Sequence, residues 1–179
     1  MNSEELIKSS KFLSYVLRHK PSVAKVTLDE NGWCNVWELI SNTNLTFDVL
    51  CKVVESNNKK RFEFDGNRNN IRARQGHSVK VDLGYDPVQP PKYLYHGTAT
   101  KNLDGIYKNG IKSGNRHDVH LSSNKKTAIN VGSRHGKPVV IRIRAVDMQE
   151  DGHKFYVTEN KVWLTDHVPV EYIHVVDFK

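Results

Sequence analysis

The chain has 179 residues, which is enough for one domain or for two small lobes. Its net charge of +7 is typical of a protein that binds a polyanion or an acidic membrane, but a soluble protein with a basic surface would have the same charge. Cys34 and Cys51 form no CxxC motif, which argues against a disulfide framework and a zinc site. The acidic N-terminus is not followed by a long apolar run, which argues against a signal peptide and a membrane span. We therefore expect a cytoplasmic protein with reduced thiols.

The first predicted element is a helix that starts at Ser3, where two glutamates complement the helix dipole, and that stops before Pro21. A turn over 29–32, a short helix over 36–41 and a longer helix over 46–56 follow. Residues 61–64 and 71–74 alternate in polarity around the turn 65–68, which predicts a β-hairpin. Three helices and a hairpin are the pattern of a winged helix, a frequent nucleic-acid-binding scaffold.

Three prolines within 87–91 cannot run through a helix or a central strand. We therefore expect a linker over 86–91 between an N-terminal lobe (1–85) and a C-terminal lobe (92–179). The predicted strands of the C-terminal lobe are 93–95, 119–121, 139–143, 154–157, 162–164 and 172–176. Two helices are also predicted in this lobe, one that ends at Asn109-Gly110 and one over 123–131. This pattern predicts an α+β lobe with a small antiparallel or mixed sheet.

The first helix ends on a basic triplet, Arg18-His19-Lys20. Cations at the end of a helix complement its dipole, and the triplet alone leaves this structural explanation open. The functional interpretation is an anion clamp, because arginine offers phosphate a planar bidentate fork and histidine adds a donor that titrates near neutral pH.

The hairpin segment from Lys59 to Lys80 carries seven cations and two acids. Alternation along the strand places Arg72 and Arg74 on one face, and the two phenylalanines of the partner strand indicate that the other face is packed. Such charges can defend an edge strand, but we favour a basic surface that binds phosphate. The Gln75-Gly76-His77-Ser78 segment that follows is by itself no more than a strand-end turn.

Two segments of the C-terminal lobe could contact a ligand. His96-Gly97-Thr98 ends a predicted strand, where a glycine permits close approach and the other two offer hydrogen bonds to a ribose or an amide, although a capped turn is the simpler explanation. Residues 115–122 gather one arginine, two histidines, an aspartate and a serine, but the HxxH spacing is not that of a zinc helix, so we expect no metal. Residues 132–138 do not match a phosphate-binding loop, because the glycine spacing is too short.

Six short segments make the chain resemble the RNA 2′-phosphotransferase family, the tRNA splicing 2′-phosphotransferases. They are Leu13-Ser-Tyr-Val-Leu-Arg-His19, Asp29-Glu-Asn-Gly-Trp33, Lys60-Arg-Phe62, Arg74-Gln-Gly-His-Ser78, Leu94-Tyr-His-Gly-Thr98 and Val119-His-Leu-Ser122. They occur in the order of the family and cover nearly the whole chain. The resemblance implies an N-terminal winged-helix RNA lobe and a C-terminal lobe with the ADP-ribosyltransferase fold, which holds NAD+.

The resemblance also implies which residues form the site. The catalytic Arg-His-Arg-Arg set of the family falls on Arg18, His19, Arg61 and Arg116. The residues expected to bind NAD+ are His96, Gly97, Thr98, His120, Leu121 and Ser122. The residues expected to contact RNA are Lys60, Arg68, Arg72, Arg74, Gln75, His77 and Ser78. We expect a monomer whose partners are 2′-phosphorylated RNA and NAD+, without a metal or a membrane.

The implied reaction has two steps. The RNA 2′-phosphate attacks C1″ of NAD+ and expels nicotinamide, and O2″ of the same ribose then attacks the phosphorus of this ADP-ribosylated RNA phosphate. The products are RNA with a free 2′-OH and ADP-ribose 1″,2″-cyclic phosphate. The first nucleophile is already an anion and needs orientation rather than a general base, whereas three arginines and a histidine suit the charge that redistributes in the second step. His19 is a candidate to move a proton between O2″ and O2′.

Three other functions fit parts of the sequence. A winged-helix regulator explains the basic hairpin but not the motifs of the C-terminal lobe. An ADP-ribosyltransferase that leaves ADP-ribose on its target would share the chemistry up to nicotinamide release. A metal-free ribonuclease that uses His19 and a second histidine predicts RNA cleavage without NAD+.

Overall fold

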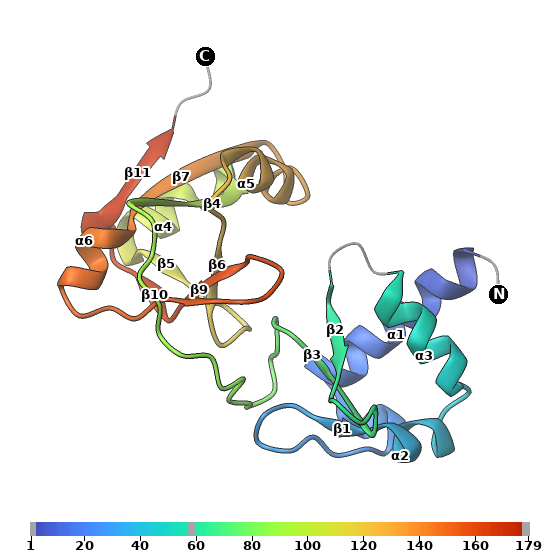
Figure 1. Ribbon diagram of the computed structural model, residues 1–179. Coiled ribbons are helices and arrows are strands. Elements are labelled where there is room, and N and C mark those ends of the chain that lie inside the picture. Colours follow the sequence, from blue (N-terminus) through green and yellow to red (C-terminus); the bar gives the residue numbers. More distant parts are fainter. Residues whose placement is uncertain (1–2, 57–59, 177–179) are drawn as a thin grey trace. The chain divides into compact units, whose positions relative to one another are not determined.

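The chain forms two compact units, Met1–Gly84 (unit 1) and Tyr85–Lys179 (unit 2), and each has its own hydrophobic core (Figure 1). The computed structural model describes residues 3–56 and 60–176. Lys59 of the predicted basic segment lies outside these ranges. Both units mix helices with small antiparallel sheets, as expected of an α+β protein.

Unit 1 contains the three predicted helices. They are α1 (Ser3–Arg18), α2 (Val36–Ser41) and α3 (Phe47–Glu55), with a 3₁₀ turn η1 (Pro21–Ala24) after α1. The side chain of Asn35 caps α2 by accepting hydrogen bonds from the first backbone amides, and the hydroxyl of Thr46 does the same for α3. These local caps explain why both helices begin where the sequence predicts.

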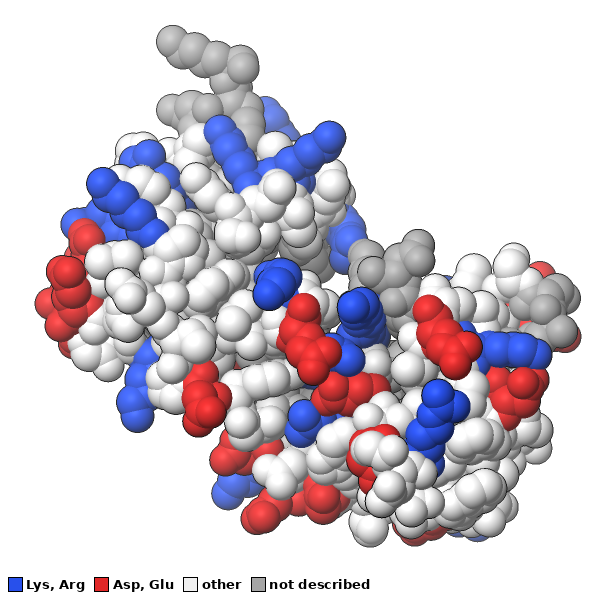
Figure 2. Space-filling view, in the orientation of Figure 1, with Lys and Arg blue, Asp and Glu red and all other residues white. Residues whose placement is uncertain are grey.

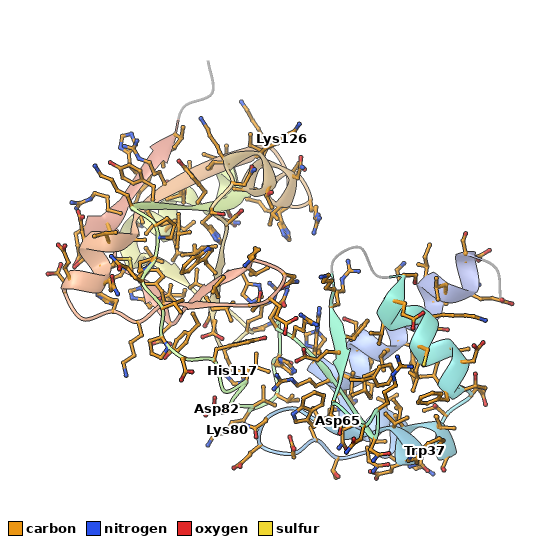
Figure 3. The ribbon with its side chains drawn as sticks, viewed as in Figure 1. Trp37, Asp65, Lys80, Asp82, His117 and Lys126 are labelled. Carbon is orange, nitrogen blue, oxygen red and sulfur yellow. The ribbon has the colours of Figure 1, made fainter. Side chains whose placement is uncertain are left out.

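The sheet of unit 1 is antiparallel with the order β1-β3-β2. Its strands are β1 (Cys34–Asn35), β2 (Phe62–Phe64) and β3 (Asn70–Ala73). The predicted hairpin is therefore confirmed, with Phe62 opposite Ala73 in the register. Its turn is held by the carboxylate of Asp65, which accepts hydrogen bonds from Asn69 N and Asn70 Nδ2 (Figure 3 labels Asp65). Buried residues of α1, α2, α3 and the hairpin close one core, including Leu13, Leu17, Leu39, Leu50, Phe62 and Ile71.

Unit 2 contains two three-stranded sheets and one two-stranded ladder, all antiparallel. The first sheet has the order β11-β7-β4, from β4 (Tyr93–Ala99), β7 (Pro138–Arg144) and β11 (Ile173–Val176). The second has the order β6-β9-β8, from β6 (Val119–Leu121), β8 (Tyr156–Val157) and β9 (Trp163–Thr165). β5 (Ile111–Lys112) pairs with β10 (His167–Val168). A bridge between Tyr95 and Ser122 joins β4 to the end of β6.

The helices of unit 2 are short. They are η2 (Thr100–Asn102), α4 (Leu103–Asn109), α5 (Lys125–Gly132), α6 (Ala145–Glu150) and η3 (Val170–Tyr172). The sequence predicted α4, α5 and most of the strands, but not α6 or the β5–β10 ladder. The strands of the β5–β10 ladder have two residues each, too few for an alternating pattern, and α6 begins without the side-chain cap that marks α2 and α3.

The prediction that β4 ends in a turn at Gly97-Thr98 was wrong. β4 continues to Ala99 and pairs along its whole length with β7. The glycine serves helix packing, because a Cβ on Gly97 would lie 1.7 Å from the carbonyl oxygen of Ala128 on α5. A side chain at this position would therefore push α5 off the sheet.

Among the described residues, no helix is long and apolar enough to cross a bilayer. Within the same ranges, no three His, Cys, Asp or Glu side chains are grouped so that they could hold a metal ion.

Candidate functional site

The C-terminal end of α1 is held by the segment that follows the hairpin. The amides of Ser78 and Val79 both donate to the carbonyl oxygen of Arg18, at 2.8 and 3.3 Å. Gly76, at φ +84°, lies beside the Arg18 side chain, and a Cβ there would be 3.6 Å from Nη1. The predicted Arg18 and Gln75–Ser78 segments, 60 positions apart in the chain, are thus parts of one local structure.

Arg18 itself is half-buried, and its guanidinium lies 5.9 Å from the ring centroid of Phe62 on β2. Stacking on an aromatic ring restricts the orientation of the planar guanidinium. A guanidinium that is oriented before ligand binding loses less conformational entropy when it binds a phosphate.

His19 is exposed and hydrogen-bonded to Ser78, with 2.9 Å between Nδ1 and Oγ. Oγ of Ser78 also lies 3.4 Å from the carbonyl oxygen of Arg18. The hydrogen bond to Ser78 occupies one of the two ring nitrogens and orients the imidazole. The predicted residues Arg18, His19 and Ser78 therefore form one cluster in unit 1.

Arg61 lies one position before β2, and its carbonyl oxygen accepts a hydrogen bond from the amide of Arg74 at 2.9 Å. The hairpin pairing therefore extends by one residue pair beyond the strands. The next residue after Arg61 is Phe62, the ring that contacts Arg18. Three of the four predicted catalytic residues accordingly lie in unit 1, two at the end of α1 and one just before β2.

The expectation of an open basic face on the hairpin was wrong for Arg72 and Arg74. Both pair with Glu63, at 2.6 Å for Arg72 Nε and 3.3 Å for Arg74 Nη2, and the three side chains are at most 15% exposed. The register explains this, because Glu63 lies directly opposite Arg72. Arg72 also stacks over Trp33 at 4.4 Å.

The remaining residues expected to contact RNA differ in accessibility. Lys60 and Arg68 are exposed, and Arg68 lies at the hairpin turn with its guanidinium 5.9 Å from the ring of Phe64. Gln75 is half-buried. His77 is only 3% exposed, which corrects its placement on an RNA-contacting surface. On the face seen in Figure 2, basic side chains are interspersed with acidic ones, so charge alone does not mark a binding surface.

In unit 2, Arg116, His120 and His96 form a chain of hydrogen bonds. Arg116 Nη1 lies 3.3 Å from His120 Nδ1, and the carbonyl oxygen of His120 lies 3.2 Å from His96 Nδ1. An arginine only donates and a carbonyl only accepts, so the proton is on Nε2 of His120 and on Nδ1 of His96. Nε2 of His96 is therefore a hydrogen-bond acceptor.

Burial lowers the pKa of His96, although its hydrogen bond to the His120 carbonyl acts in the opposite direction, and the nearby charge of His135 lowers it further. His96 is therefore neutral at neutral pH. A neutral imidazole with a free lone pair on Nε2 matches a ribose hydroxyl or a carboxamide rather than a phosphate.

Three of the residues expected to bind NAD+ have packing roles in unit 2. Gly97 makes room for α5, Leu121 is 3% exposed in the core, and Thr98 is buried with its hydroxyl accepting a hydrogen bond from Asn102. Ser122 is half-buried and pairs with Tyr95 through the backbone, and its Oγ accepts from the amide of Asn124. The side chains that could meet a ligand are therefore those of His96, His120 and Ser122.

Unit 2 also contains a cavity of about 460 Å³ that no sequence motif predicted. It is lined by Lys112, Ser113, Gly114, Asp166 and His167. The lining comes from two segments that meet only because β5 pairs with β10, so no local motif could predict it.

Burial raises the pKa of Asp118. The nearby charge of His117, labelled in Figure 3, lowers this pKa, and the nearby charge of Asp166 raises it.

The chain matches the family model of "RNA 2'-phosphotransferase, Tpt1 / KptA family" over residues 4–167. It is 49% identical over 175 residues to a protein of Pectobacterium carotovorum named "Probable RNA 2'-phosphotransferase", and the alignment covers 94% of each chain. A protein of the same name from Flavobacterium johnsoniae is 49% identical over 177 residues, with 96% of this chain and 97% of the relative covered. An Agrobacterium fabrum protein, again of that name, is 49% identical over 172 residues, with 93% and 92% covered.

Proposed function

Because the chain belongs to the RNA 2′-phosphotransferase family, a family of transferases, we propose that it removes an internal 2′-phosphate from RNA, such as that of a tRNA splice junction, with NAD+ as the consumed co-substrate. The products would be RNA with a free 2′-OH, nicotinamide and ADP-ribose 1″,2″-cyclic phosphate. The observation that carries the proposal is the cluster of Arg18, His19 and Ser78 at the end of α1.

The cluster suits a dianionic phosphate in its composition. Arg18 offers several N–H donors in a fixed plane, His19 offers a ring nitrogen, and the hydroxyl of Ser78 holds the imidazole in place. Arg61, in the same unit, and Arg116, in unit 2, are proposed to add positive charge during transfer of the phosphoryl group. Pre-positioned cations of this kind stabilise the transition state without having to reorganise.

The residues of unit 2 fit a ribosyl and carboxamide ligand. Neutral His96 offers an acceptor, His120 and Ser122 are half-buried polar side chains, and Arg116 is held beside them through His120. We propose that these four residues hold the nicotinamide ribose. NAD+ supplies there an electrophilic anomeric carbon with a good leaving group and a neighbouring hydroxyl.

His19 is proposed to move a proton during phosphate release. An imidazole can both accept and donate a proton, and the hydrogen bond between Nδ1 of His19 and Ser78 orients the ring for that role. The RNA phosphate is already an anion, so the attack on the ribose carbon requires orientation by Arg18 rather than a base. This division of work explains why the set contains one histidine and no carboxylate.

The architecture agrees with this proposal. Three helices followed by a hairpin make unit 1 a candidate winged-helix RNA lobe, and the paired small sheets of unit 2 make it a candidate ADP-ribosyltransferase-like lobe. We propose that RNA binding by unit 1 relies on Lys60 and Arg68, which are exposed, rather than on Arg72 and Arg74, which are largely buried and share an ion pair with Glu63.

The test is incubation of the protein with NAD+ and an RNA oligonucleotide that carries one internal 2′-phosphate. We expect 2′-OH RNA and nicotinamide in equal amounts, and a loss of roughly 10²–10³ in rate for Arg18→Ala and for Arg116→Ala. Arg144→Ala is the matched control, because Arg144 is exposed and pairs with Asp147. A stable ADP-ribosylated RNA would instead indicate a transferase that stops after one step, and RNA cleavage without NAD+ would indicate a ribonuclease.

A further inference from the structure

Tyr15 on α1 is an exposed aromatic residue beside the phosphate-binding cluster. Its neighbours Leu13, Val16 and Leu17 are fully buried, whereas Tyr15 is 45% exposed. The core of unit 1 therefore uses the other side of the helix, and nearly half of the Tyr15 surface remains accessible to solvent. An exposed aromatic ring beside a phosphate-binding cluster can stack on a nucleic-acid base.

The spacing along α1 brings this ring to the cluster. Tyr15 precedes Arg18 by three residues and His19 by four, so the three side chains share one face of the helix. The ring centroids of Tyr15 and His19 are 6.3 Å apart, with 45° between the planes. Helical side chains lean toward the N-terminus, so the imidazole lies over the turn that carries Tyr15.

A cation continues the same face. Lys11 lies four residues before Tyr15 and is exposed. We call Lys11, Tyr15, Arg18 and His19 the α1 stripe. It presents, in order along the helix, an ammonium group, an aromatic ring and a guanidinium–imidazole pair. This alternation matches a nucleic-acid strand, in which phosphates alternate with flat bases.

We propose that the nucleotide that carries the 2′-phosphate binds along the α1 stripe, with its phosphate at Arg18 and His19 and its base stacked on Tyr15. The 2′-phosphate and the base belong to the same ribose and are separated by a few ångströms, as are the imidazole and phenol rings. Lys11 then contacts a backbone phosphate of the same strand. This inference rests on the proposed function, because it takes Arg18 and His19 as the phosphate site.

The proposal defines the substrate class further. Every base has an aromatic face, so stacking on Tyr15 accepts any base but requires that the base be unstacked from its neighbours. The protein should therefore prefer a 2′-phosphate in a single-stranded or looped segment over one inside a regular duplex. Tyr15 is a positioning residue here, since it touches the base and not the reacting atoms.

The experiment compares two 2′-phosphorylated oligonucleotides that differ only in whether the phosphorylated nucleotide has a base. Binding is measured by fluorescence anisotropy without NAD+, and KM for RNA and KM for NAD+ are measured in the full reaction. Wild-type protein should bind the abasic RNA about 5- to 150-fold more weakly than the RNA with the base. Tyr15→Ala should weaken binding of the RNA with the base by a similar factor and leave KM for NAD+ unchanged.

Two variants complete the design. Tyr15→Phe keeps the flat ring and should restore binding of the RNA with the base. Trp37→Ala removes another exposed aromatic ring of unit 1, 55% exposed on α2 and outside the α1 stripe, and should bind both RNAs as the wild type does (Figure 3). Tyr15→Ala should also show no preference between the two RNAs, because the contact that distinguishes them is absent.

The outcome that overturns the inference is a wild-type protein that binds both RNAs equally, a result that does not depend on whether any variant folds. A preference that follows the base of a neighbouring nucleotide would also overturn it. Failure of the proposed function would look different. Phosphate removal would then be absent with NAD+, while the anisotropy comparison would still report whether Tyr15 contacts the base.

Discussion

Nη1 of Arg116 lies 3.3 Å from Nδ1 of His120, so a proposed catalytic arginine is held by a histidine from the proposed cofactor pocket. The backbone of the same histidine accepts a hydrogen bond from His96. Replacement of the His120 side chain should therefore release Arg116 but keep the backbone contact to His96, and this coupling between His120 and Arg116 can be tested by mutation.

His120→Ala should lower kcat/KM for NAD+-dependent phosphate removal by about 10- to 150-fold, because hydrogen bonds to charged groups contribute about 1.5–3 kcal/mol. His120→Asn should lose less, since its amide oxygen can accept from Arg116 in place of Nδ1. His174→Ala, on the exposed side of β11, is the control. Steady-state kinetics with varied NAD+ measures the effect, and equal activity of wild type and His120→Ala would contradict the coupling.

Ser78→Ala removes the hydroxyl that orients His19. A neutral hydrogen bond contributes about 0.5–1.5 kcal/mol, so kcat should fall by roughly 2- to 13-fold, and the pH dependence of kcat should shift because the imidazole loses a partner. Ser78→Thr keeps the hydroxyl and should retain the wild-type profile. A lower kcat with an unshifted pH profile would mean that Ser78 supports the loop but not the imidazole.

Glu63→Gln should destabilise unit 1. The substitution leaves Arg72 and Arg74 side by side in a half-buried site without their shared counter-charge. The expected loss in the free energy of unfolding is about 3 kcal/mol. This value is at the lower end of the range for broken buried ion pairs, because the side chains retain some exposure. Urea unfolding measures this loss. Asp48→Asn breaks an exposed pair with Lys52 and should cost under about 1 kcal/mol. Equal losses for the two variants would contradict a structural role of Glu63.

Gly97→Ala should displace α5, because the new Cβ would meet the carbonyl oxygen of Ala128 at 1.7 Å. The expected loss of stability is about 3 kcal/mol or more. Gly105→Ala is the matched control, since Gly105 is inside α4 with no atom within 4 Å of its Cβ position, and it should stabilise by about 0.5–1 kcal/mol. Thermal unfolding of both variants checks the contrast, which would fail if Gly97→Ala melted like the wild type.

The lowered pKa of His96 predicts a dependence of stability on pH. The unfolded chain, with a pKa near 6.5, takes up a proton that folded His96 does not, so the free energy of unfolding falls as the pH drops below about 6.5 toward the folded pKa. Above that pH the contribution is fully present. His96→Gln removes this titration and should reduce the difference in stability between about pH 7.5 and about pH 5.5. An unchanged difference would show that His96 is not desolvated.

The helices and the hairpin of unit 1 could be predicted closely, because their signals are local. Asn35 and Thr46 cap helices within three residues of themselves, and Pro21 stops α1 one turn after its last basic residue. Unit 2 was predicted less well. The β5–β10 ladder is too short to carry a periodic pattern, α6 lacks a side-chain cap, and the predicted β4 was too short because Gly97 resembled a turn residue.

The sequence by itself determined the family, the order of the main elements and the identity of the residues that can carry charge and protons. Only the tertiary structure decided which of them are available. Glu63 pairs with Arg72 and Arg74 because the hairpin register places it opposite Arg72, and His77 is buried while His19 is exposed at the end of α1. The physical reason is range. Capping and periodicity act within a few residues, whereas burial and charge pairing depend on partners that only the folded chain brings near.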